Sequence, residues 1–522
     1  MGGSIATATH FTSARRRQYG AAVLQTARLQ GAACLFAVAL LIAGVVRLCL
    51  RFDGLYGQDA FAYFRFARAI GPHLLHGAPL PLLFWPRGYP AAVALLLPLT
   101  GGGPFAGQLV SALACAWTAA ATLLLVKELD HRGGDPADST APLVAGLCVA
   151  ASGVVLRSSQ VVMADGLSIG LCATALWSFA RFLRTRRGPW LVACALALGW
   201  GAVTRWQVGL LALPLGVAAA VDRRGRRARG ETAGGMKWWA VAALAGLAVL
   251  IPQLVAAQAV PHALAQHEWL QRWSPLNALG RDFHNSEGHV HYRFPVGIFY
   301  LIRLGWPDAL FPTVLALAAV GGVEIVRQRR GVEIALLIGW PLCNGAFVAG
   351  IPYENPRFLW PALPALGALA GIGYRIVRQR LPERSRSWLA LALAASLAAG
   401  LALGAREHAR TVARKNADRA LVSWIDGQVP AGTTLLMPGG TLMAEHYGRT
   451  QVRDTYLLSP AEVPSLLARD CPCLYLENPT ERETTQAGLR TQLFSDALRR
   501  QAGLTPVAWW PPLVLFRVGA PR

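Results

Sequence analysis

Residues 104–126 read PFAGQLVSALACAWTAAATLLLV, an apolar run without a charged side chain. Because a transmembrane helix needs ~20 predominantly apolar residues, this run is long enough to cross a bilayer. The same character extends along the whole chain, which has 522 residues, of which 54% are hydrophobic and only 15% are charged. A soluble protein of this length could not bury so much apolar surface, so the sequence predicts a polytopic membrane protein.

Eleven such runs follow one another along the chain, several of them nearer ~16 than ~20 residues. Flanking tryptophan and arginine side chains can complete the shorter crossings at the bilayer surface. The runs lie at 31–50, 104–126, 141–156, 166–180, 189–204, 206–221, 238–260, 309–323, 334–352, 358–374 and 388–405. We therefore expect about eleven transmembrane helices. The short run at 88–100 is expected to lie at the interface or to re-enter the membrane.

The formal net charge is +22, almost all of it from arginine. The arginines gather in short clusters in alternate connections between apolar runs, as at 15–17, 222–230 and 374–386. This positive-inside pattern predicts an inner-membrane protein with a cytoplasmic N-terminus and with its long loops and C-terminus outside. Membrane topology explains the charge better than nucleic-acid binding does, so no nucleic-acid partner is expected.

The chain divides into a basic N-terminus (1–30), a transmembrane core (31–405) and a tail (406–522). The tail alternates short apolar runs with turn residues and polar helical stretches, which predicts a small extracytoplasmic α/β domain beside an all-α membrane core. Its two cysteines, Cys471 and Cys473, lack a second cluster that would make a zinc site, and their tight spacing disfavours a mutual disulfide.

Two lone carboxylates stand beside outward-facing ends of apolar segments. Asp59 lies in GLYGQDAFAYFRFARAI (54–70), and Asp165 lies in SSQVVMADGLSIGLC (158–172). A carboxylate near hydrocarbon costs a few kcal/mol, so each is a candidate catalytic residue. The alternative is that each caps the helix that follows it, because Asp is stabilising at a helix N-terminus.

The same outward loops carry further candidates for substrate binding: Tyr63, Arg87, Arg205, Glu354 and Arg357. Arginine binds phosphate oxygens through a planar fork and stays charged, a nearby carboxylate can accept a proton, and aromatic rings suit the face of a sugar. Two alternatives remain open at this point. Arg205 could anchor a short span by snorkelling, and Glu354 could pair with Arg357 in a surface turn.

The longest later loop contains DFHNSEGHVHYR (282–293), in which His289 and Tyr292 are candidate substrate contacts. Solvated histidines are the simpler alternative. This stretch also offers metal-ligand types at loose spacing, so a divalent metal is possible, but a plain polar loop fits better and no metal ligand or other cofactor is assigned.

These motifs, in this order, resemble the GT-C superfamily of polyprenyl-phosphate-sugar-dependent membrane glycosyltransferases, in particular the protein O-mannosyltransferases and bacterial aminoarabinose transferases. The resemblance covers about residues 30–375. It is carried by Asp59, the GYPAAVALLLPL segment, MADG with Asp165, TRWQVGLLALPL with Arg205 and PRFLWPALPAL with Arg357. It implies a many-spanning helical core, interfacial helices in the first outer loop and a C-terminal outer domain.

The resemblance also implies inverting transfer of a sugar from a polyprenyl-phosphate carrier to an acceptor hydroxyl on a protein, lipid or glycan. Asp59 would be the base, Asp165 would orient a substrate, and Arg205 and Arg357 would receive the phosphate. One departure is that the family often has paired acids in the first loop, whereas Ala60 follows Asp59 here. The rival class is a lipid-linked-sugar flippase or transporter without transfer chemistry, which would favour ionisable residues deep in mid-span.

Overall fold

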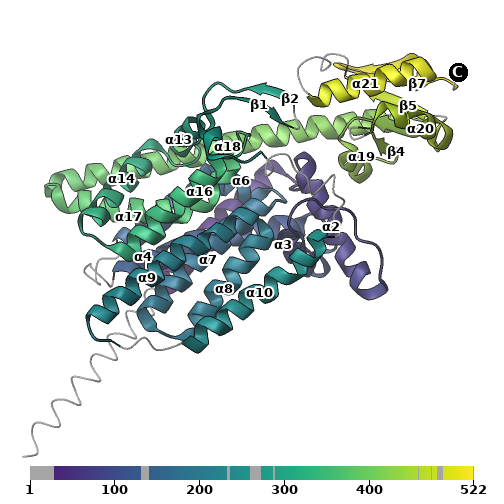
Figure 1. Ribbon diagram of the computed structural model, residues 1–522. Coiled ribbons are helices and arrows are strands. Elements are labelled where there is room, and N and C mark those ends of the chain that lie inside the picture. Colours follow the sequence, from purple (N-terminus) through teal and green to yellow (C-terminus); the bar gives the residue numbers. More distant parts are fainter. Residues whose placement is uncertain are drawn as a thin grey trace, which may run out of the picture.

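The structure is a computed structural model, and it describes residues 29–130, 140–231, 236–258, 272–285, 288–455, 458–471, 473–478 and 486–520. Within these ranges the chain forms a large bundle of helices and a smaller domain that contains a sheet (Figure 1). The predicted combination of an all-α membrane core with a small α/β tail is confirmed.

A helix occupies each of the eleven predicted apolar runs. The principal core helices are Leu29–Leu50, α4 (Phe105–Asp130), α5 (Thr140–Ala150), α6 (Gly153–Gln160), α7 (Ala164–Thr185), α8 (Gly188–Thr204), α9 (Ala212–Ala228), α10 (Met236–Gln258), α14 (Pro312–Arg327), α16 (Trp340–Ala349), α17 (Leu363–Arg380) and α18 (Glu383–Gln428). Among the described residues, length and composition support six membrane-spanning helices, or seven if α5 and α6, bent by 54°, form one broken span.

The bundle is held together by helices with apolar side chains on most of their faces. α4 packs along α7, α7 along α8, and α8 along α10, while α17 packs between α5 and α14. α10 keeps Leu244, Ile251 and Leu254 exposed, as expected of a helix whose outer face meets lipid.

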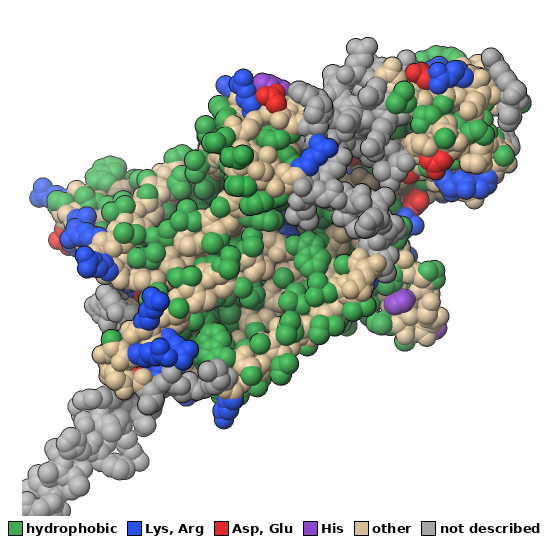
Figure 2. Space-filling model, viewed as in Figure 1, with side chains coloured by type: hydrophobic (Ala, Val, Ile, Leu, Met, Phe, Trp, Pro, Cys, Tyr) green, Lys and Arg blue, Asp and Glu red, His purple; other side chains and the backbone are tan. Residues whose placement is uncertain are grey.

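Charge is distributed unevenly over the bundle. Figure 2 shows hydrophobic side chains over most of one face of the core, with lysine and arginine side chains at the end away from the tail. On α9, for example, Arg223, Arg224 and Arg227 are exposed. This distribution matches the arginine clusters in the sequence, and the assignment of that end to the cytoplasm stays a prediction.

Residues 51–103, which are predicted to form the first outer loop, fold into α2 (Gly57–His76), α3 (Gly88–Leu96) and the short helix η1 (Leu97–Thr100). α2 is amphipathic as predicted: Phe61 and Phe64 are buried, whereas Arg65 and Arg68 are exposed. α3 and η1 together are too short to count as a span by themselves, in keeping with the interfacial or re-entrant segment expected at 88–100.

The tail domain, which follows α18, contains a five-stranded sheet in the order β4-β3-β5-β7-β6. β3 (Thr434–Met437) runs parallel to β4 (Gln451–Asp454) and β5 (Cys473–Glu477), and β7 (Leu513–Val518) runs antiparallel to β5 and β6 (Leu504–Trp510). Its helices are α19 (Thr441–Tyr447), α20 (Val463–Asp470) and α21 (Gln486–Gln501). Contrary to the expectation from their spacing, Cys471 and Cys473 form a disulfide.

α18 runs without a break from Glu383 to Gln428, so the predicted boundary at 405 falls inside a helix. Past that point α18 continues beside the first outer loop (Figure 1). There Lys415 forms an ion pair with Asp53, and the Tyr447 hydroxyl donates to Asp53 Oδ2 over 2.7 Å. The tail domain is therefore anchored to the loop segment that leads into α2.

We expect Lys415→Met to loosen this anchor. The Lys415 side chain is only 4% exposed, and loss of one partner from a buried pair leaves the other charge uncompensated. Hydrogen exchange of residues 52–64 should then increase by about tenfold. Arg65→Gln is the matched control, because its ion pair with Glu445 is exposed and contributes ~0–1 kcal/mol. Equal exchange in the two variants would contradict a specific role for Lys415.

Candidate active site

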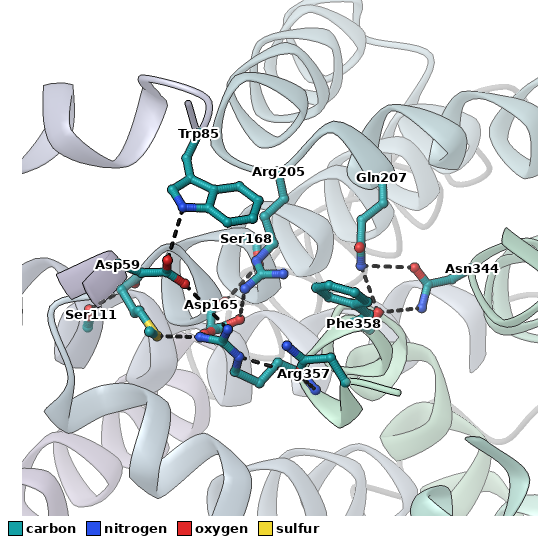
Figure 3. Close-up of polar contacts among 12 residues, drawn as sticks. Asp59, Trp85, Ser111, Asp165, Ser168, Arg205, Gln207, Asn344, Arg357 and Phe358 are labelled. Carbon is teal, nitrogen blue, oxygen red and sulfur yellow. Dashed lines mark hydrogen bonds and ion pairs between the residues drawn. The ribbon is translucent and has the colours of Figure 1, made fainter. Parts of the chain in front are cut away.

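Four of the predicted residues meet at one place (Figure 3). Asp165 forms an ion pair with Arg205. Arg357 bridges the two aspartates, with its Nη2 3.4 Å from Asp59 Oδ2 and its Nη1 3.7 Å from Asp165 Oδ2. Residues far apart in the sequence thus form a single charged cluster in which two carboxylates face two guanidinium groups.

Neither aspartate acts as a helix cap. Asp59 lies in the first turn of α2 and Asp165 in the first turn of α7, but neither helix start has a side-chain cap hydrogen bond. Instead, Trp85 Nε1 donates to Asp59 Oδ1 over 3.0 Å, and Asp165 faces the arginines. Both carboxylates therefore make contacts between elements, which is the arrangement expected of site residues.

Arg205 lies just before one short helix and Arg357 lies within another. Arg205 lies in the extended link between α8 and η2 (Trp206–Leu211), and Arg357 lies in η5 (Pro356–Ala362). Gln207 Nε2 donates to the Phe358 carbonyl over 2.7 Å and to Asn344 Oδ1 over 3.2 Å. Asn344 Nδ2 donates to the same carbonyl over 3.1 Å. These buried amides, which sequence reasoning missed, fix the two arginine-bearing turns against each other.

The cluster lines a cavity of about 940 Å³. Of the nine predicted site residues, six line it: Asp59, Tyr63, Arg87, Asp165, Arg205 and Arg357. The other walls are rich in aromatic and apolar side chains, including Leu83, Phe84, Trp85, Trp206, Phe347, Ile351, Phe358 and Trp360. A cavity of this size and lining suits a ligand with a polar head and an apolar remainder.

The two aspartates differ in their exposure and in the number of ion pairs that they form. The Asp165 side chain is 5% exposed and is held by two arginines, whereas the Asp59 side chain is 26% exposed and has one looser ion pair. Burial lowers the pKa of the Arg357 guanidinium, but Asp165 and Asp59 outweigh this effect, so that pKa lies above its usual value. Asp59 is thus the carboxylate that an incoming group can reach, and Asp165 is the one that organises the arginines.

Tyr63, on α2, is buried beside the cluster. Burial, reinforced by the nearby Asp59 carboxylate, raises the pKa of the Tyr63 phenol, so it remains a neutral hydroxyl. Its ring packs edge-on against Tyr89, with the centroids 5.4 Å apart. Tyr63 can therefore donate a hydrogen bond into the cavity without adding charge.

Arg87 contributes a separate positive charge. The following residue, Gly88, packs against the end of α8, where an added Cβ would lie 2.6 Å from the Val203 carbonyl oxygen. The Arg87 guanidinium lies over the Phe66 ring at 5.2 Å and makes no ion pair within the described part of the chain. Burial lowers the pKa of Arg87, as expected of a cation that lacks a carboxylate partner. Its charge is available to an anionic ligand.

Known proteins are similar to this chain in part of its sequence and in its fold. Residues 86–256 match the family model of dolichyl-phosphate-mannose-protein mannosyltransferases. The structure is similar to ArnT from Cupriavidus metallidurans bound to undecaprenyl phosphate, with a TM-score of 0.61 and 17% identity over 94% of this chain and 99% of that chain. The fold of this chain is similar to that of GT-C glycosyltransferases.

A second similar structure is AglB, the archaeal oligosaccharyltransferase from Archaeoglobus fulgidus in complex with an inhibitory peptide and a dolichol-phosphate. It has a TM-score of 0.57 and 12% identity, covering 91% of this chain and 72% of that chain. No curated protein sequence is significantly similar to this chain. The likeness to GT-C proteins is therefore a likeness of fold at low sequence identity.

Three predicted residues lie outside the described lining of this GT-C cavity. Glu354 has Arg303 as its charged neighbour, and the alternative Glu354–Arg357 pair does not form, because Arg357 contacts the aspartates. Tyr292 follows β2 (Gly288–His291), which pairs with β1 (Asp282–Asn285). His289 lies within β2, but its side chain is outside the described residues.

A divalent metal ion, which the sequence left possible, has no evident site among the described residues. Within the described ranges, no three His, Cys, Asp or Glu side chains gather as a metal site. Both aspartates of the cavity face arginines instead. The residues described thus do not fit a metal ion bound at the cluster.

Glu354→Gln should stabilise the protein at about pH 8 but have little effect at about pH 5. Burial raises the pKa of the Glu354 carboxyl from 4.5 to about 7. The folded chain therefore holds this proton more tightly than the unfolded chain, and the resulting stability is present below pH ~4.5 and lost as the pH rises through ~7. Thermal unfolding in detergent at both pH values tests this, with exposed Glu383→Gln as the control. An equal pH dependence in Glu354→Gln and wild type contradicts it.

Proposed function

We propose that this chain is a membrane glycosyltransferase that moves a sugar from a polyprenyl-phosphate carrier to an acceptor hydroxyl. The observation that carries the proposal is the cluster in which a partly exposed Asp59 faces a cavity that is also lined by Arg357 and by Arg87, which has no ion pair among the described residues. Support also comes from ArnT and AglB, whose structures contain undecaprenyl phosphate and a dolichol-phosphate, respectively.

In the proposed reaction, Asp59 accepts the proton of the acceptor hydroxyl. The acceptor oxygen forms a bond to the anomeric carbon as the bond from that carbon to the phosphate oxygen breaks. The polyprenyl phosphate leaves with the bonding electrons, and in-line attack inverts the anomeric carbon. Asp59 suits this role better than Asp165, because Asp165 is fully buried and already holds two cations.

The phosphate of the carrier would lie between Arg87 and Arg357. Arg87 has no carboxylate partner among the described residues, and Arg357 lies 3.4 Å from Asp59 and 3.7 Å from Asp165, so neither of its ion pairs is close. Both guanidinium groups can therefore turn toward the charge that develops on the leaving phosphate. Arg205 already forms an ion pair with Asp165, which also contacts Arg357. We therefore assign Arg205 to orienting Arg357 through the Asp165 carboxylate, and not to direct contact with the phosphate.

The cavity would open on the outer side of the cytoplasmic membrane, with the tail domain outside as well. The arginine clusters of alternate connections support this orientation. The first outer loop, which supplies Asp59, Trp85 and Arg87, would then lie at the outer surface of the bilayer, where a lipid carrier presents its head group.

The proposal is tested with the purified chain in vesicles, supplied with polyprenyl-phosphate sugars labelled in the sugar and with envelope extracts as acceptors. Label that appears covalently on an acceptor, and only with the wild-type chain, supports the transferase. Label that crosses the bilayer without a new bond supports the flippase instead. No transfer from any hexose or pentose donor would exclude the proposed function.

A further inference from the structure

A second polar wall of the cavity is formed by α6 and α18. These helices touch through their backbones, because a Cβ added to Gly153 would lie 2.6 Å from Gly404 Cα. About one helical turn beyond each glycine stand Arg157 on α6 and His408 on α18, and both line the cavity. The close approach of two small residues thus brings the helix that leads to the tail domain into contact with the substrate cavity.

His408 is unusual because it is buried and has no hydrogen-bond partner. Its side chain is 0% exposed, and neither Nδ1 nor Nε2 has a partner in the described structure. The ring packs edge-on against Phe52, with the centroids 5.1 Å apart. Buried polar groups are almost always hydrogen-bonded, so an imidazole that lacks a partner, in a residue that lines the cavity, can take one from a ligand once its ring turns toward the cavity.

The chemistry of this wall differs from that of the arginine cluster. Arg157 is compensated by Asp308, with Nη2 3.2 Å from Oδ2. Burial of His408, reinforced by the nearby Arg157 charge, disfavours a positive charge on the imidazole. Ser158 and Thr411 add hydroxyl groups to the same wall. The wall therefore offers hydrogen-bond donors and acceptors with little net charge, which suits the hydroxyls of a sugar better than a phosphate.

We propose that Arg157, Ser158, His408 and Thr411 form a carbohydrate subsite in which His408 binds sugar hydroxyls. This inference rests on the proposed function, which supplies two sources of such a group: the sugar of the donor or a sugar-bearing acceptor. In either case the helix that carries the tail domain contributes directly to substrate binding.

The decisive variant is His408→Phe in the full-length chain. Phenylalanine fills a similar volume and removes both ring nitrogens, so a purely structural role predicts unchanged or greater thermal stability and unchanged ligand binding. The subsite predicts unchanged stability together with about tenfold weaker binding of a sugar, the effect of losing one or two neutral hydrogen bonds. His408→Gln, which keeps one donor and one acceptor, should restore part of the loss. His76→Phe, at the exposed end of α2, is the matched control.

Two probes separate the sources of the sugar: undecaprenyl phosphate without a sugar, and undecaprenyl phosphate carrying a hexose or pentose. If Kd rises only for the sugar-bearing carrier, the subsite holds the donor sugar. If neither Kd changes but transfer at subsaturating acceptor falls about tenfold, the subsite holds the acceptor. Weaker binding of both carriers by the same factor, or no change in binding and transfer, overturns the subsite. A sugar-specific Kd change in a chain that transfers nothing would reject the proposed function and keep the subsite.

Discussion

Asp59→Asn is expected to lower kcat for sugar transfer by a factor of about 10²–10⁴ while the protein still folds in the membrane. An amide cannot accept the acceptor proton at neutral pH, but its carbonyl oxygen can still take the hydrogen bond from Trp85. Arg357 keeps Asp165 as a partner 3.7 Å away, and Arg205 keeps its ion pair with Asp165, so neither guanidinium of the cluster is left without a carboxylate. The loss should therefore appear in the rate and not in the stability.

The measurement is the initial rate of transfer at saturating donor, taken with the Kd of sugarless undecaprenyl phosphate. We expect the transfer rate to fall by this factor. The Kd of the carrier should change little, because Arg87 and Arg357 remain. Asp282→Asn makes the same chemical change on exposed β1, outside the cavity lining, and should retain full activity. Full activity in Asp59→Asn would remove this carboxylate from the mechanism. Loss of carrier binding would show instead that its role lies in holding the arginines.

The sequence was most informative where a charge stands alone in apolar surroundings. Asp59, Asp165, Arg205 and Arg357 each interrupt or border an apolar segment, and the structure brings all four together. A charge at such a position has few reasons to be there besides a partner or a ligand. These four positions could be picked out from single residues because burial near a membrane makes every charge costly.

Pairing between distant turns could not be predicted in the same way. Glu354 stands three residues before Arg357, yet only Arg357 points to the aspartates, because the side on which a short helix presents its side chains depends on packing. Gln207 and Asn344 look like ordinary polar residues in apolar runs until the Phe358 carbonyl is placed between them. Local sequence does not contain that tertiary information.

His408 was missed for a related reason. The last apolar run was predicted to end at 405, which would have put His408 in a separate tail domain. The structure continues the helix to Gln428 and packs it against α6 through Gly153 and Gly404. A crossing between two glycines far apart in the sequence leaves no periodic pattern, although a histidine four residues after a glycine in a long helix could have been noted as a candidate.

Asp165→Ala is expected to lower stability as well as activity, in contrast to Asp59→Asn. The Asp165 side chain is 5% exposed and compensates Arg205 and Arg357. Removing one member of a buried ion pair costs about 3–5 kcal/mol, because the remaining charge is left uncompensated. Arg205 should lose its ion-pair partner. Arg357 should turn toward Asp59, and the Asp59 carboxylate would then be less able to accept a proton. Thermal inactivation in detergent and transfer rates measure the two effects.

A double-mutant cycle distinguishes loss of the Asp165–Arg205 ion pair from a general loss of packing. In Asp165→Ala with Arg205→Met, both charges are gone, so the double variant should be more stable than the sum of the two single effects implies, by ~1–3 kcal/mol. Activity should not recover, because Arg357 would still lack the carboxylate that positions it. Additive losses of stability would show that Asp165 and Arg205 do not depend on each other. A stable but inactive Asp165→Ala variant would instead give Asp165 a direct role in the chemistry. Asp165, and not Asp59, would then be assigned as the general base.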